Sequence, residues 1–137
     1  MRRFAGWFFS TPDVPITIRR TISWWERRRI AFNVVVGAYG FVCLMIFFAA
    51  ITTSGSLKPG EDAVEPVAIM AAPFGINLLY TLGWIVEIPA RLLFHGLSPR
   101  FGPFLLKVGL GIGVILISLP PAVWGGYRLF QIVGLTE

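Results

Sequence analysis

The stretch of sequence that decides the fold is IAFNVVVGAYGFVCLMIFFAAI, residues 30–51, which contains no charged side chain. A helix needs about 20 apolar residues to cross a bilayer core about 30 Å thick, so this stretch is long enough to span a membrane by itself. Two similar runs follow: VEPVAIMAAPFGINLLYTLGWIV at residues 64–86 and PFLLKVGLGIGVILISLPPAVW at residues 103–124.

The composition of the whole chain agrees with these three runs. Of its 137 residues, 55% are hydrophobic and only 14% are charged, and the mean hydropathy is +0.74. A soluble domain carries about 25% charged residues, so this chain has too few charges to cover a surface that faces water. The sequence therefore predicts an all-α membrane protein with a three-helix transmembrane domain at residues 30–124.

Prolines lie inside the second and the third predicted span. Pro73 lies inside the second span and is expected to kink it, because proline removes a backbone donor. Pro120 and Pro121 are expected to bend or end the third span. Residues 125–137 are too short to span and are expected to form a C-terminal tail at the membrane interface.

Residues 1–29 form a separate arginine-rich segment. Ile18, Ile22 and Trp25 share one helical face while arginines fall elsewhere, which predicts an amphipathic helix lying on the membrane surface. Tryptophan favours the headgroup region, and arginine marks the side of a span that faces water. The residues expected to anchor the chain at the membrane surface are Trp24, Trp25, Arg27, Arg28 and Arg29.

The distribution of basic residues predicts the orientation. Seven arginines precede the first span, whereas the loop after it carries only Lys58 beside three acidic residues. Arg91 and Arg100 lie between the second and third spans, and the tail has only Arg128. The positive-inside rule then places the N-terminus in the cytoplasm and the C-terminus outside. Attraction to anionic lipid explains the arginines, so we expect no nucleic-acid partner.

Polar side chains recur at spacings of three and four along the second span, which places them on one helical face. One interpretation is that this polar face lines a site or channel between helices. The other, which we favour, is that it packs against a neighbouring helix, because no second acid or histidine lies at the same depth. The residues of the polar face are Asn77, Tyr80, Thr81, Trp84 and Glu87.

Two charges near the cytoplasmic ends of the second and third spans are candidates for an ion pair. Glu87 ends the second span and Lys107 lies one turn into the third. Because these spans are antiparallel and joined by a short loop, we expect Glu87 and Lys107 to pair and to fix the register of the hairpin.

The residue types of a catalytic or metal site are scarce. Cys43 is the only cysteine and His95 the only histidine, and neither has ligands or catalytic partners at a useful spacing. We therefore expect no enzymatic activity, catalytic residue, metal or cofactor. Small residues such as Gly109 and Gly113 favour close helix packing. We expect an accessory or assembly subunit, or a small homo-oligomer; the alternative is an oligomeric channel or transporter component lined by the polar face.

Two strings carry a resemblance to other proteins. WWERRRIAFN (residues 24–33) and NLLYTLGWIVE (residues 77–87) resemble a loose group of small bacterial multi-pass membrane proteins. Those proteins have W-W-E followed by basic residues and an N-x-x-Y-x-L-G-W-x-x-E second helix. The resemblance implies a location in the bacterial cytoplasmic membrane and no particular activity.

Overall fold

The computed structural model describes residues 2–12, 17–54, 66–94 and 96–134. These residues form four α-helices and no strand: α1 (Arg2–Phe8), α2 (Ile18–Ser54), α3 (Pro66–Leu93) and α4 (Phe101–Ile132). The last three are long and apolar enough to cross a membrane. The predicted all-α class and the three candidate spans are therefore confirmed. Lys58 and the three acidic residues of the first loop, as well as His95, lie outside the described residues.

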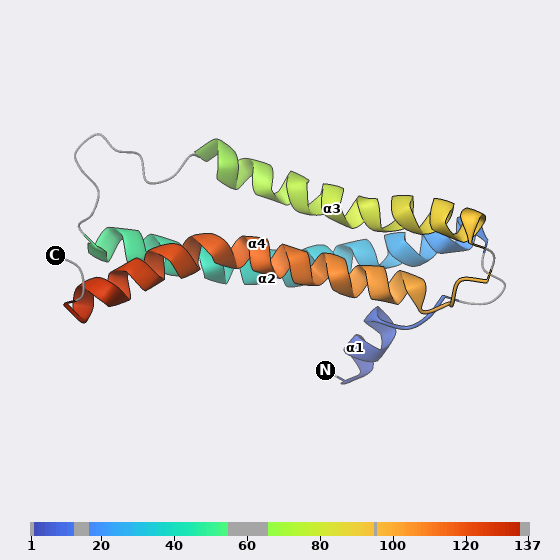
Figure 1. The fold of residues 1–137 in the computed structure, drawn as a ribbon, viewed down its shortest axis with the longest axis horizontal. Helices are drawn as coiled ribbons and strands as arrows, with labels where there is room; N and C mark the ends of the chain where they lie inside the picture. The colour runs from blue at the N-terminus through green and yellow to red at the C-terminus, as the bar shows by residue number, and fades with distance from the viewer. Residues whose placement is uncertain (1, 13–16, 55–65, 95, 135–137) are drawn as a thin grey trace.

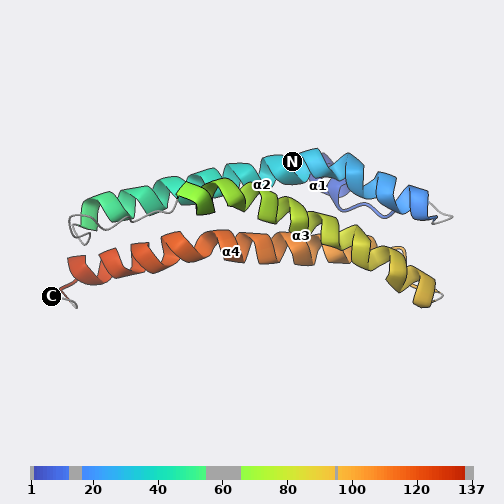
Figure 2. The same ribbon diagram turned by 90° about the horizontal axis from the view of Figure 1, so that it is seen from above.

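The three long helices form an elongated bundle (Figure 1). α2 and α4 run in the same direction and share the most extensive interface, while α3 runs antiparallel to both. The start of α3 diverges from its two neighbours, and the end of α3 closes onto them (Figure 1). Viewed from above, α3 crosses from α2, where it begins, to the first turns of α4, where it ends (Figure 2).

The first long helix begins well before the apolar run that predicted it. α2 contains 37 residues, which at 1.5 Å per residue corresponds to about 55 Å and exceeds a bilayer core of about 30 Å. Residues 18–29 are the first turns of α2 and form no separate helix, since the chain has no break at Arg29. No proline lies between Ile18 and Ser54, so nothing in the sequence ends the helix there.

The third long helix continues past the point where its two prolines were expected to bend or end it. α4 includes Pro120 and Pro121 and extends to Ile132. Proline removes single backbone donors, and a helix in an apolar environment can continue through such positions. Most of the predicted tail of residues 125–137 is therefore helical.

The buried side chains gather at the end of the bundle where α2 and α4 begin. This core cluster joins aromatic rings from α1, α2 and α3 to one leucine of α4; its buried members are Phe8, Trp24, Trp25, Phe32, Val36, Tyr80 and Leu106. Elsewhere large apolar side chains point outward, among them Phe74, which is 78% exposed. Such surfaces are expected where the solvent is lipid.

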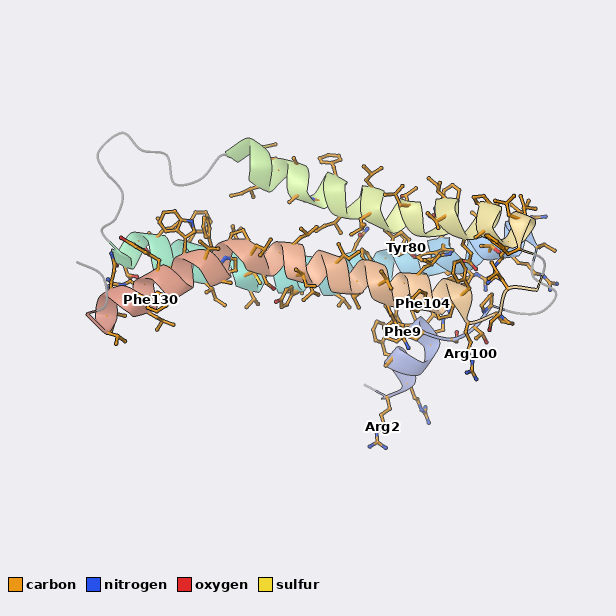
Figure 3. All side chains as sticks on the ribbon, in the orientation of Figure 1. Arg2, Phe9, Tyr80, Arg100, Phe104 and Phe130 are labelled. Carbon is orange, nitrogen blue, oxygen red and sulfur yellow. The ribbon has the colours of Figure 1, made fainter. Side chains whose placement is uncertain are left out.

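The short helix α1 lies at a steep angle to the three long helices and packs beside the first turns of α2 and α4 (Figure 1). Phe8 of α1 is buried in the core cluster, whereas Phe4 and Trp7 are exposed. In Figure 3, Arg2 points away from the bundle at the far end of α1.

Candidate functional site

The predicted polar face of α3 lies against α2 and does not face outward. Tyr80 and Glu87 are buried, and the other three residues are half-buried. Four of the five have hydrogen-bond partners on α2. In Figure 3, Tyr80 lies between α3 and the two other long helices. The candidate site is therefore an internal α2–α3 contact, and its details follow from the residues on the two facing helices.

A chain of polar contacts runs along one edge of this interface. The Asn33 amide donates a hydrogen bond to Asn77 Oδ1 at 3.1 Å, and the Thr81 hydroxyl donates to the Asn77 carbonyl at 2.7 Å. Both terminal nitrogens of Arg29 donate to Thr81 Oγ1, at 3.3 and 3.4 Å. The same guanidinium also binds the Glu26 carboxylate at 2.7 and 2.8 Å. This series of polar contacts thus connects the partly exposed ion pair of Arg29 and Glu26 to the side-chain amides of Asn33 and Asn77.

Tyr80 sits at the centre of an aromatic cluster. Its hydroxyl donates a hydrogen bond to the Trp25 carbonyl, and only 2% of the residue is exposed. Its ring meets the Trp25 ring edge-on at 5.2 Å and the Phe32 ring at 4.7 Å. The Arg29 guanidinium lies 5.1 Å from the Tyr80 ring centroid, within cation–π range. These contacts fix the register between α2 and α3.

Glu87 is 1% exposed and connects three parts of the chain. Its carboxylate accepts a hydrogen bond from Trp25 Nε1 at 2.6 Å and one from Arg91 Nε at 2.7 Å. Arg91 NH2 lies 2.6 Å from the carboxylate, which completes a two-point ion pair. Arg91 also donates to the carbonyls of Leu97 and Ser98, at 3.3 and 3.5 Å. A single buried carboxylate therefore joins α2, α3 and the loop before α4.

Two glycines make room for this arrangement. A methyl group on Gly83 would lie 2.5 to 3.0 Å from three atoms of the Trp25 indole. A methyl group on Gly102, at the start of α4, would lie 2.8 and 2.9 Å from the two Glu87 carboxylate oxygens. Carbon atoms pack best at about 3.5–4.0 Å, so neither position accommodates a side chain without displacement of its neighbour.

The predicted ion pair between Glu87 and Lys107 is not formed. Lys107 is exposed, and its ammonium group lies 5.3 Å from the ring centroid of Phe9. Glu87 is instead paired with Arg91, four residues later on the same helix. The reason is geometric: Lys107 is five residues beyond Gly102, the α4 residue beside Glu87, and therefore lies about 140° further round the helix. The i, i+4 spacing of Glu87 and Arg91 was a sequence signal for the observed pair.

Trp84 is the one member of the polar face without a polar partner. Its Nε1 atom is buried and makes no hydrogen bond in the described structure. The indole packs against the hydrophobic core cluster. Trp84 therefore contributes apolar contact area to the α2–α3 interface.

Arg28 holds α1 against the bundle through hydrogen bonds, and the sequence did not predict this role. Only 4% of Arg28 is exposed, and its guanidinium donates to the carbonyls of Trp7 and Phe8 at 2.8 and 2.9 Å. It also donates to Ser10 Oγ at 2.7 Å. The guanidinium lies 4.0 Å from the Trp24 ring centroid. Because the last carbonyls of a helix lack partners within it, Arg28 supplies donors at the C-terminal end of α1.

The five predicted membrane-surface anchors therefore have different environments. Trp24, Trp25 and Arg28 are enclosed by side chains and backbone of the protein itself. Arg29 is half-buried against α3, and Arg27 is exposed. The N-terminal segment encloses Trp24 and Arg28, whereas α3 encloses Trp25 through Tyr80, Gly83 and Glu87. The sequence contains no local signal for contacts between segments this far apart.

An open apolar groove lies beside the polar contacts between α2 and α3, where the start of α3 diverges from the other two long helices. Its volume is about 740 Å³. Asn33 and Gly37 of α2, Pro73 and Asn77 of α3, and Pro120 of α4 are among the residues that line it. Protein interiors are normally close-packed, so a space of this size among the described residues is large enough to hold a ligand.

No protein-family model, curated protein or solved structure matches this chain. The resemblance carried by residues 24–33 and 77–87 therefore stays a prediction. Among the described residues, no three His, Cys, Asp or Glu side chains come together in a group that could hold a metal ion.

Proposed function

We propose that this chain is a non-enzymatic integral membrane protein that acts by helix packing, as an accessory or assembly subunit or as a small homo-oligomer. The observation that carries the proposal is that the polar face of α3 is used inside the bundle. Asn77, Tyr80, Thr81 and Glu87 all have partners within the chain. A face that lines a channel has to present such groups to water or to another subunit.

The outer surfaces support an association with other membrane helices. Gly75 on α3 and Gly111 on α4 are exposed, and no atom lies within 4 Å of a methyl group added at either position. Small residues in lipid let helix backbones approach closely, which is a main source of association between transmembrane helices. Neighbouring large side chains such as Phe74 and Leu78 are exposed and apolar. A partner subunit or a second copy would find close-packing positions on both helices.

We place the protein in the bacterial cytoplasmic membrane with its N-terminus inside the cell. The excess of arginine before residue 30 supports this orientation. The steep angle of α1 suits a helix that lies at the membrane interface, with its exposed Phe4 and Trp7 toward lipid. Arg2 and Arg3 are exposed on α1 and suit contact with anionic headgroups.

Native mass spectrometry tests the proposal. The tagged chain is extracted from its own membrane in mild detergent, and the masses of the intact assemblies are measured. The expected result is an assembly with other membrane proteins or with further copies of this chain. A chain recovered only as a monomer, from membranes cross-linked before extraction as well as from untreated ones, would contradict the proposal.

A conductance measurement addresses the alternative of an oligomeric channel lined by the polar face. Purified protein is reconstituted into proteoliposomes and the ion flux is measured for the natural chain and for Asn77→Leu. The proposal predicts no flux above that of empty vesicles. A flux that Asn77→Leu abolishes would favour the channel, because the substitution removes a polar group from the face.

A further inference from the structure

The apolar groove and the arginine beside it form one continuous feature on α2. Arg29, Asn33, Gly37, Gly40 and Leu44 follow one another at spacings of three and four, so they share one face of the helix. The last four line the groove, and Arg29 lies one turn beyond its end. Along about four helical turns of this face, the side chains therefore change from apolar at Leu44 to an amide at Asn33 and a cation at Arg29.

The facing side of α3 changes in the same direction. Ile69, Pro73, Asn77 and Thr81 are spaced by four residues, and the first three line the groove. Thr81 lies beyond the groove and accepts hydrogen bonds from Arg29. The facing sides of α2 and α3 are therefore both apolar along the groove, and both are polar at the end where the Arg29 guanidinium lies.

We propose that this feature is a binding site for one anionic glycerophospholipid, with an acyl chain in the groove and its phosphate beside Arg29. The volume of about 740 Å³ falls within the range of about 300–1,000 Å³ typical of ligand sites, which are mostly apolar with a few placed polar groups. The inference is independent of the proposed function, because the site is complete within one chain.

The charge around Arg29 matches an anionic headgroup. Three consecutive arginines, Arg27 to Arg29, stand beside a single acid, Glu26. The Glu26–Arg29 ion pair is partly exposed, with 44% and 26% of the two side chains accessible, so it does not withdraw Arg29 from the surface. Guanidinium groups bind phosphate through several N–H donors, and a phosphate beside Arg29 would share these donors with the Glu26 carboxylate.

The dimensions and the amides match the rest of such a lipid. The groove extends along α2 from Asn33 to Phe47, about 21 Å at 1.5 Å per residue. An extended hydrocarbon chain advances about 1.25 Å per carbon, so about 17 carbons span this length. Asn33 uses one of its two side-chain N–H groups on Asn77. The other suits an ester carbonyl, which lies between the phosphate and the chain.

Native mass spectrometry of the purified full chain tests this site with phosphatidylglycerol and phosphatidylcholine that carry identical acyl chains. The expected result is one tightly retained phosphatidylglycerol per chain. Arg29→Gln should lower the preference for the anionic lipid about fivefold, whereas Arg27→Gln, two residues away and on another side of α2, should lower it less. Equal retention of the two lipids by the natural chain would overturn the proposal.

A second pair of variants tests the groove. Gly37→Leu places a side chain in open groove space and should lower lipid retention about tenfold, the effect of losing about two buried CH₂ groups. Gly111→Leu is the matched control, because Gly111 is exposed on α4 and lies outside the groove lining. Equal effects of the two substitutions would overturn the proposal.

Photochemical labelling of the natural chain keeps the test valid if the glycine variants fail to fold. A phosphatidylglycerol with a diazirine near the end of one acyl chain should label the groove around Cys43, Leu44 and Leu116. Labels spread over the outer side chains of α3, such as Phe74 and Leu78, would show ordinary annular lipid and overturn the proposal. A partner helix or a second copy recovered in the groove in place of lipid would also overturn it.

Discussion

Gly83→Ala provides a sharp test of the α2–α3 contact. The added methyl group would lie 2.5 to 3.0 Å from three atoms of the Trp25 indole, which is 1% exposed and hydrogen-bonded to Glu87. Overpacking costs about 1–3 kcal/mol, and loss of a hydrogen bond to a charged group costs about 1.5–3 kcal/mol. Alanine recovers about 1 kcal/mol of helix propensity. The free energy of unfolding should therefore fall by about 1.5–5 kcal/mol.

The assay is equilibrium unfolding in mild detergent by titration with sodium dodecyl sulfate, followed by far-ultraviolet circular dichroism. Gly75→Ala is the matched control, because Gly75 lies on the same helix and no atom lies within 4 Å of its added methyl group. The control should unfold at the same detergent fraction as the natural chain or at a higher one. If Gly83→Ala were as stable as Gly75→Ala, the close contact between Gly83 and Trp25 would be refuted.

Three further predictions follow from other contacts. In double-mutant cycles on the free energy of unfolding, Glu87→Gln and Arg91→Met should be coupled by about 1 kcal/mol or more. Glu87→Gln and Lys107→Met should show no coupling, and coupling to Lys107 alone would contradict the observed ion pair. Arg28→Leu should speed amide hydrogen exchange in α1 while leaving the long helices unchanged, and unchanged exchange in α1 would disprove its fastening role. Asn77→Leu should cost only about 0.6 kcal/mol in the unfolding titration, since hydrogen bonds between membrane helices average that value; a cost of several kcal/mol would assign it a larger role.

The spans could be predicted from the sequence because each is a local property. A helix in lipid satisfies its own backbone hydrogen bonds, so an uncharged run of sufficient length is enough to predict it. The ends could not be predicted in the same way. α2 begins at Ile18, where Thr17 Oγ1 accepts a hydrogen bond from the Arg20 backbone N–H, and Trp24 and Trp25 pack in the core cluster one to two turns later. α4 passes through Pro120 and Pro121 to Ile132.

The polar face of α3 could be predicted for a similar reason, since the spacing of Asn77, Thr81 and Glu87 follows from helix geometry alone. Its partners could not, because the register between two helices depends on packing of the whole bundle. Nothing near Trp25 in the sequence indicates a hydrogen bond to Glu87, 62 residues away. The folding of α1 back onto Arg28 is a contact of the same kind.

Four polar side chains of α3 are bonded to α2 and line no aqueous pathway, and cysteine accessibility in native membranes tests this arrangement. Thr81→Cys is made in a Cys43→Ala background and treated with a charged, membrane-impermeant thiol reagent from either side of the membrane. Arg27→Cys, at an exposed position, serves as the reactive control. Because Thr81 is half-buried against α2, Cys at position 81 should react much more slowly than Cys at position 27. Modification at position 81 as fast as at position 27 would show an aqueous pathway along the polar face and would refute its closure by α2.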